Sequence, residues 1–270
     1  MNDSCQIPAV KGSVKQVLNE YVDSDSPYQL VMIHGIADSA DVWRETCEML
    51  PFRFSSYHEL ELPWSIEVGD PIRYKPAPEQ ILHDVWKQLP DGKKIVLAHS
   101  FGANSLLAMT QHEPLTEVVA VIMLSVYSKP DFADFDWPLF VRYVNEFDKF
   151  LASSIAVRSG ACSMSDRSKQ VILEKTKQMY SPSSWMQFYM VFSQTPGLDL
   201  SPLTMPVLVL GGANDISIAY EDIREFSSRL PDADFVFFED CGHFAMLEQP
   251  EYIAETIFGF LNKRNLLCQK

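Results

Sequence analysis

Short apolar runs alternate with amphipathic helical segments along most of this chain, and this alternation constrains its fold more than any other feature. The run at residues 118–124 is continuously apolar and rich in β-branched residues, as in parallel strands that are covered on both faces. Strands are expected at 14–22, 28–33, 55–62, 95–98, 118–124, 206–210 and 234–238, and helices at 41–50, 81–89, 104–112, 218–230 and 251–261. The pattern predicts an α/β fold with a mostly parallel, doubly covered central sheet.

The alternation is interrupted once, between residues 125 and 202. Apolar residues keep helical spacing at 139–151 and at 185–192, and no strand candidate lies between them. We expect a helical cap over the carboxyl edge of the sheet, where open α/β sheets bind ligands. A chain of 270 residues can form one large or two small domains. The predicted organisation is a core of residues 1–124 and 203–270, with residues 125–202 inserted as the cap.

The sharpest local signal is Ala98-His99-Ser100-Phe101-Gly102, which follows an expected strand and precedes an expected helix. A nucleophile elbow has this context, and its turn is so tight that the residues two before and two after the serine must be small. Ala98 and Gly102 meet this requirement. The following helix directs its positive end toward an oxyanion formed there. Ser100 is therefore the candidate nucleophile, against the alternative of an ordinary serine in a loop.

A serine hydroxyl needs an adjacent base, and the base needs a carboxylate to orient it. Of the six histidines, His243 follows the last expected strand, at the same sheet edge as Ser100. Asp215 follows the penultimate strand, and the order Ser100, Asp215, His243 is typical of this kind of sheet. The alternatives are a structural histidine, a helix-capping role for Asp215, and a cap aspartate such as Asp131 as the acid.

Acyl transfer also requires hydrogen-bond donors where negative charge develops. The backbone N–H of Phe101, directly after the candidate nucleophile, is one expected donor. The other is the N–H of Ile36, in the loop His34-Gly35-Ile36 after an early strand. Gly35 would let this loop approach the elbow closely. The alternative is a simple strand-to-helix turn.

Together these segments resemble the α/β-hydrolase superfamily, in its single-domain, cap-bearing branch. The resemblance rests on Ile33-His34-Gly35-Ile36 with Asp41-Val42-Trp43, on Ala98-His99-Ser100-Phe101-Gly102, on Gly212-Ala213-Asn214-Asp215, and on Gly242-His243-Phe244 with Glu248-Gln249-Pro250. It extends from about Tyr28 to Leu261 and implies a Ser-Asp-His triad. Haloalkane dehalogenases and epoxide hydrolases of this fold carry an aspartate where this chain has Ser100. The branch is similar to esterases, thioesterases, lipases, C–C bond hydrolases, lyases and peroxidases alike.

The cap supplies many aromatic residues, which more often pack together than contact substrate. Part of its inner face should nevertheless line the cleft, and no cluster of Arg or Lys is evident there. We therefore expect a hydrophobic small-molecule ester or thioester, cleaved through an acyl-enzyme on Ser100. The alternatives are a C–C bond hydrolase, a natural-product enzyme that releases or cyclises an acyl chain, and a small-molecule receptor. The candidate pocket residues are His34, Trp64, Phe140, Trp185, Tyr189 and Phe244.

Charge and cysteine content restrict the partners and the compartment. A net charge of −14, from 36 acidic and 22 basic residues, disfavours nucleic acid and anionic membrane surfaces. No apolar run is long enough to span a membrane. The five cysteines form no C-x-x-C pair, so neither a disulfide framework nor a zinc site is predicted, and a cytoplasmic location is expected. No motif indicates a metal or an organic cofactor, and none indicates an oligomeric state.

Overall fold

Seven strands form one sheet in the order β1-β3-β2-β4-β5-β6-β7. The computed structural model describes residues 12–65, 77–158, 165–179 and 182–267, with residues 19, 179 and 182–185 described by their backbone alone. β1 is antiparallel to β3 and all other pairs are parallel, so the expected mostly parallel sheet is confirmed. The strands are β1 (Ser13–Val17), β2 (Tyr28–Ile33), β3 (Ser56–Glu61), β4 (Lys93–His99), β5 (Val118–Leu124), β6 (Val207–Gly212) and β7 (Ala233–Phe238).

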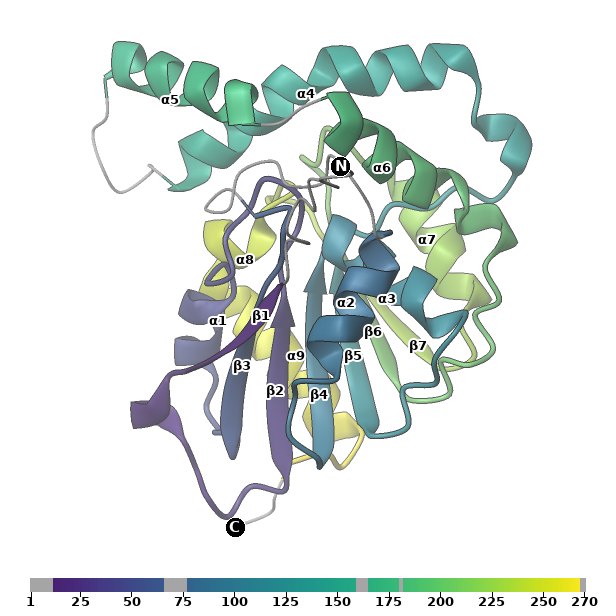
Figure 1. Ribbon diagram of the computed structural model, residues 1–270. Coiled ribbons are helices and arrows are strands. Elements are labelled where there is room, and N and C mark those ends of the chain that lie inside the picture. The colour runs from purple at the N-terminus through teal and green to yellow at the C-terminus, as the bar shows by residue number, and fades with distance from the viewer. Residues whose placement is uncertain (1–11, 66–76, 159–164, 180–181, 268–270) are drawn as a thin grey trace, which may run out of the picture.

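Helices cover both faces of this sheet. α2 and α3 lie on one face, and α1 and α9 lie on the other (Figure 1). No helix in the described part of the chain combines the length and apolar character needed to cross a membrane. The core helices are α1 (Arg44–Met49), α2 (Pro78–Trp86), α3 (Phe101–Thr110), α7 (Tyr220–Arg229), α8 (Ala245–Glu248) and α9 (Pro250–Lys263).

Two details differ from the sequence prediction. The strand expected over residues 14–22 ends at Val17, because Leu18 adopts a left-handed φ of 55° and leads into the 3-10 helix η1 (Asn19–Tyr21). The short helix α8 was not expected, since one turn is too short to show helical periodicity.

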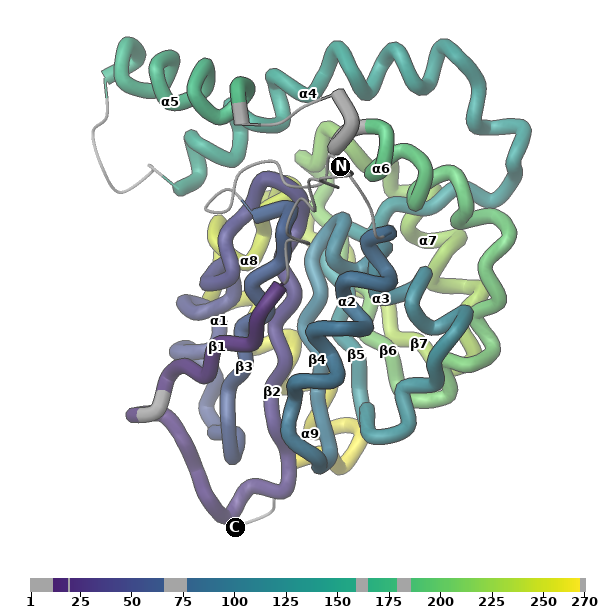
Figure 2. The backbone as a smooth tube through the Cα atoms, viewed as in Figure 1, coloured from purple at the N-terminus to yellow at the C-terminus, as the bar shows by residue number. Residues whose placement is uncertain are grey.

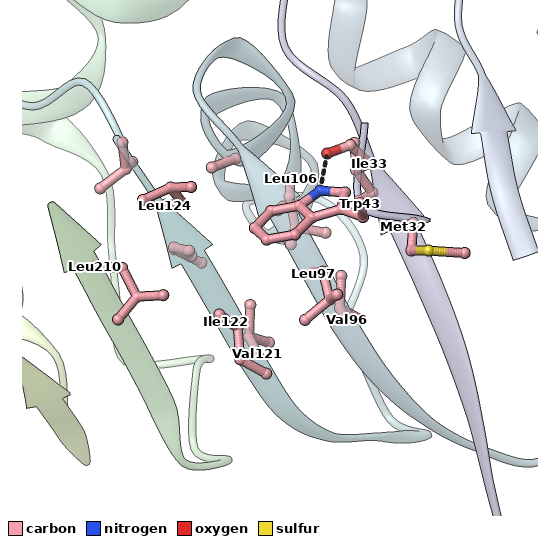
Figure 3. Packing of buried hydrophobic residues seen from close by; sticks show 14 of the residues in the cluster. Met32, Ile33, Trp43, Val96, Leu97, Leu106, Val121, Ile122, Leu124 and Leu210 are labelled. Carbon is pink, nitrogen blue, oxygen red and sulfur yellow. Dashed lines mark hydrogen bonds between the residues drawn. The ribbon is translucent and has the colours of Figure 1, made fainter. Parts of the chain in front are cut away.

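The central strands are buried on both faces, which explains their continuously apolar sequences. Trp43 lies among residues of β2, β4 and β5 (Figure 3), and its indole N–H donates to the carbonyl oxygen of Ile33 at 3.3 Å. Trp43, Leu97 and Ile122 are fully buried in this cluster. This packing fixes the carboxyl ends of neighbouring strands, from which the candidate catalytic residues emerge.

Between β5 and β6 the chain leaves the core, forms helices above the carboxyl ends of the strands and then returns (Figure 2). These are the 3-10 helix η3 (Phe132–Asp134), α4 (Trp137–Arg158), α5 (Asp166–Met179), α6 (Pro182–Ser193) and the 3-10 helix η4 (Thr195–Gly197). The helical insertion is thus confirmed. The sequence did not predict α5, because most of its residues are polar and exposed and it has no wide apolar stripe.

Candidate active site

Ser100 occupies a sharp turn between the end of β4 and the start of α3. Its backbone has φ 52° and ψ −125°, a conformation that costs energy in a residue with a side chain. A Cβ atom at Gly102 would lie 2.4 Å from the carbonyl oxygen of His34, so a side chain at this position would collide with the neighbouring loop. Ala98, the other small position, is fully buried. The turn therefore has the geometry expected of a nucleophile elbow.

The structure brings Ser100, His243 and Asp215 into one hydrogen-bonded chain. The Oγ atom of Ser100 lies 2.9 Å from Nε2 of His243, and Nδ1 of His243 lies 2.7 Å from Oδ2 of Asp215. The N–H of Ser217 donates to the other carboxylate oxygen of Asp215 at 2.8 Å. All three side chains of the chain are buried, so few water molecules compete for these contacts. This arrangement can activate a serine and stabilise an imidazolium.

The environment of Asp215 keeps its carboxyl group ionised. Burial acts to raise the pKa of this group, but the charge and the hydrogen bond of His243, with further hydrogen bonds from Ser217 and Ser125, hold the pKa below its ordinary value. Asp131, the alternative acid, is exposed at the start of η3 and accepts a hydrogen bond from the N–H of Ala133 at 2.9 Å. The structure therefore places Asp215 beside His243 and leaves Asp131 as a local cap.

The loop after β2 packs directly against the elbow. A Cβ atom at Gly35 would lie 3.1 Å from Cβ of Ser100, so only glycine permits this approach. The indole N–H of Trp64 donates to the carbonyl oxygen of His34 at 3.2 Å and holds the loop from behind. Ile36 lines the cavity described below, and Phe101 is the first residue of α3, whose N–H has no partner within its helix. The donation of both amides to an oxyanion stays a prediction.

His34 is fully buried and neutral, and both of its ring nitrogens are hydrogen-bonded to backbone groups. Nδ1 donates to the carbonyl oxygen of Gly35 at 2.8 Å, and Nε2 accepts from the N–H of Leu62 at 3.2 Å. Burial lowers the pKa of His34 to about 4. Its role in this structure is to shape the loop beside the elbow.

A small cavity of about 20 Å³, roughly the space of one water molecule, lies between the sheet edge and the cap. Its walls are mostly aromatic, and the ring of Phe150 packs edge-on against the ring of His243 with 5.0 Å between the centroids. The hydroxyl of Tyr143 donates to the carbonyl oxygen of Ser217 at 2.9 Å. The cavity is lined by Ile36, Tyr127, Tyr143, Glu146, Phe147, Phe150, Phe188 and Ser217.

Five of the six pocket residues expected from the sequence do not line this cavity. Phe140 and Tyr189 pack against each other within the cap, with centroids 4.9 Å apart. Trp64 and Phe244 are fully buried, like His34, and none of the three lines the cavity. The side chain of Trp185 lies outside the described residues.

The aromatic residues of α4 that line the cavity have the same helical spacing as Phe140. The sequence therefore did not show which aromatic residues of this helix reach the cavity. Among the residues that the structure describes, no three His, Cys, Asp or Glu side chains are grouped to hold a metal ion.

Comparisons with known proteins agree with this fold. A model described as "Alpha/beta hydrolase family" matches residues 30–256. A pimeloyl-[acyl-carrier protein] methyl ester esterase of Nitrosomonas europaea is 27% identical over 239 residues, which cover 82% of this chain and 91% of the relative.

Solved structures with the same fold include an esterase from Exiguobacterium antarcticum, with a TM-score of 0.67, 14% identity and coverage of 93% of this chain and 95% of that one. The lip1 protein of Acinetobacter baumannii has a TM-score of 0.67, 16% identity and coverage of 94% of this chain and 92% of that one. At these identities the structural likeness shows the fold alone.

Proposed function

Because this chain belongs to the alpha/beta hydrolase family, we propose that it is a serine hydrolase that cleaves an ester of a hydrophobic small molecule. The observation that carries this proposal is the continuous hydrogen-bonded chain from Ser100 through His243 to Asp215, with distances of 2.9 and 2.7 Å. These contacts lie beside a small cavity with mostly aromatic walls.

In the proposed mechanism, Oγ of Ser100 attacks the ester carbonyl carbon while Nε2 of His243 takes the hydroxyl proton. The amides of Ile36 and Phe101 donate to the oxyanion that forms. His243 then passes the proton to the departing alkoxide, and an acyl-enzyme remains on Ser100. Water, deprotonated by His243, attacks the acyl group, so that the carboxylic acid leaves and Ser100 regains its proton. Asp215 keeps the ring oriented and stabilises its charged form.

The cavity favours an uncharged, apolar acyl group. Tyr143, Phe147, Phe150 and Phe188 supply aromatic surface, and among the described lining residues only Glu146 carries a charge. A carboxylate at this position repels an anionic acyl tail. The relative from Nitrosomonas europaea is named as an esterase of a methyl ester, which supports an ester as the bond that is cleaved. A thioester is the second candidate bond, because the same acyl transfer serves both.

A substrate panel tests this proposal. We would compare p-nitrophenyl and methyl esters of increasing acyl length with acyl-CoA thioesters and β-diketones. We expect apolar esters to give the highest kcat/KM. Preference for a β-diketone would replace ester hydrolysis with C–C bond cleavage, and faster cleavage of short polar esters would contradict the apolar pocket. No reaction with any substrate, and no labelling by a fluorophosphonate, would favour a small-molecule receptor.

A further inference from the structure

A buried carboxylate outside the Ser-His-Asp chain joins the parts of the site that come from distant segments. Asp38 has no exposed surface and follows Ile36 in the loop beside the elbow. It accepts a hydrogen bond from the N–H of Ser39 at 2.8 Å and pairs with Arg158 through Oδ1. Its Oδ2 lies 3.1 Å from Nδ1 of His99. A buried carboxylate is costly unless it is paired and hydrogen-bonded, so these contacts depend on one another.

His99 extends this contact to the candidate base. Its Nε2 lies 3.0 Å from the backbone carbonyl oxygen of His243, and Oγ of Ser125 lies 3.3 Å from the same oxygen. The rings of His99 and His243 lie with centroids 4.9 Å apart. Burial, followed by the nearby His243, lowers the pKa of His99 well below the ordinary histidine value, so the neutral ring has a single N–H, which donates to only one of the two oxygens, of Asp38 or of His243, at a time. His99 therefore supports the loop that carries the base without sharing its proton chemistry.

Arg158 brings in the cap, because it is the last residue of α4. The face of α4 that meets the site is a single stripe with spacings of three or four residues, as expected for one side of a helix. This stripe lines the cavity, packs on the ring of His243 and ends at the guanidinium that meets Asp38. Its members are Tyr143, Phe147, Phe150, Ser154 and Arg158.

We propose that Asp38, His99 and Arg158 are positioning residues that couple the seating of α4 to the placement of His243. With the pair between Arg158 and Asp38 formed, α4 holds Phe150 against the ring of His243, and Asp38 holds His99 against its backbone. Without the pair, α4 moves away from the sheet edge, and His243 loses its contacts with Phe150 and His99. The inference rests on the proposed function, since it concerns the alignment of the same serine and histidine.

Substitutions at Arg158 provide the cleanest test, because its side chain is 29% exposed and is not part of the core. Arg158→Met removes the charge but keeps the length, and Arg158→Lys restores the charge. We expect Arg158→Met to lower kcat by about ten- to a hundredfold, a usual cost of a small misplacement of catalytic groups, while Arg158→Lys recovers most of the loss. The rate of fluorophosphonate labelling of Ser100 should fall in parallel.

Lys177→Met is the matched control within the cap. Lys177 of α5 pairs with Asp148 of α4 at 2.7 Å, away from the elbow. This variant should keep the wild-type kcat and labelling rate. Amide hydrogen exchange should show faster exchange in α4 for Arg158→Met than for Lys177→Met. An equal effect of the two variants would show that the contact between Arg158 and Asp38 only stabilises the cap in general, and this result would overturn the proposal.

A double-mutant cycle tests whether Arg158 acts through Asp38. If it does, Asp38→Asn combined with Arg158→Met should be no slower than Asp38→Asn alone. Additive losses, or wild-type kcat in Arg158→Met with only KM changed, would contradict the coupling. An inactive and unlabelled wild type would instead disprove the proposed function, and the exchange of α4 would still report whether the pair seats the cap.

Discussion

The Oδ2 atom of Asp215 lies 2.7 Å from Nδ1 of His243, and both side chains are almost completely buried. Because a carboxylate can only accept, this contact places the ring proton on Nδ1 and leaves Nε2 free to accept from Ser100. The relationship links residues that lie 28 positions apart and emerge after two different strands, β6 and β7. The sheet therefore brings together an acid and a base that are separate in the sequence.

Replacing Asp215 by Asn should keep the shape of the site but lose the fixed tautomer. We expect kcat to fall by about 10³–10⁴-fold, the order seen when a triad aspartate is replaced in this way. Asp131→Asn is the control, because Asp131 only caps η3. Steady-state kinetics on the same ester would measure both. A larger loss in Asp131→Asn than in Asp215→Asn would transfer the acid role to the cap.

Gly102→Ala should distort the elbow. The added Cβ would lie 2.4 Å from the carbonyl oxygen of His34, a backbone atom that cannot move without shifting the loop of Ile36. We expect slower labelling of Ser100 and a loss of about 1–3 kcal/mol in the free energy of unfolding, as for other overpacked sites. Ala98→Gly restores the small residue more usual at the first position and should label at the wild-type rate. Equal behaviour of the two variants would show that the turn tolerates a side chain at Gly102.

The buried His34 predicts that stability is lost on mild acidification. Its pKa is about 4 in the folded chain against an ordinary value of 6.5, so the unfolded chain takes up a proton that the folded chain refuses. The contribution is complete above pH 6.5 and is lost as the pH falls toward 4, by about 3 kcal/mol in total.

Urea unfolding at several pH values would measure this effect. His34→Asn should make the decline between pH 6.5 and pH 4 less steep, while His112→Gln, at an exposed position after α3, should keep it. An unchanged slope in His34→Asn would contradict the account.

The cavity predicts how acyl-chain preference depends on the cap. Phe147→Ala removes part of the lining and should shift the optimum toward longer acyl chains, by about tenfold in the relative kcat/KM of long and short esters. Phe140→Ala should leave the optimum unchanged, because Phe140 stacks on Trp137 and packs edge-on against Tyr189 within the cap. A chain-length profile of p-nitrophenyl esters distinguishes the two. A shift caused by Phe140→Ala alone would place the substrate nearer the N-terminal end of α4.

Much of the fold was predictable because the central strands are buried on both faces. β2 and β5 begin and end at the predicted residues, since apolar runs bounded by polar loops leave little freedom in placing them. β1 and α5 were predicted less well or not at all. β1 is a mostly exposed edge strand, and α5 lies over the core with mostly polar residues, so neither carries a strong apolar pattern.

The candidate triad was visible in the sequence because its members follow strands whose carboxyl ends meet at one edge. The cavity lining was not, because Phe140 and Phe147 lie two turns apart on the same side of α4, and only the tertiary packing decides which of them reaches the cavity. The role of Asp38 was hidden for a related reason. Its partners His99 and Arg158 lie 61 and 120 positions away in the sequence, so no local motif indicates these contacts.

Covalent labelling by a fluorophosphonate, with the modified residue mapped by mass spectrometry, tests the central claim most directly. The account predicts one adduct on Ser100 in the wild type and none in Ser100→Ala. Ser105→Ala, one turn further along α3, should label like the wild type, because Oγ of Ser105 donates to the carbonyl oxygen of Phe101 at 2.8 Å and takes no part in the site. An adduct on another residue, or equal labelling of Ser100→Ala, would contradict the assignment of Ser100 as the nucleophile.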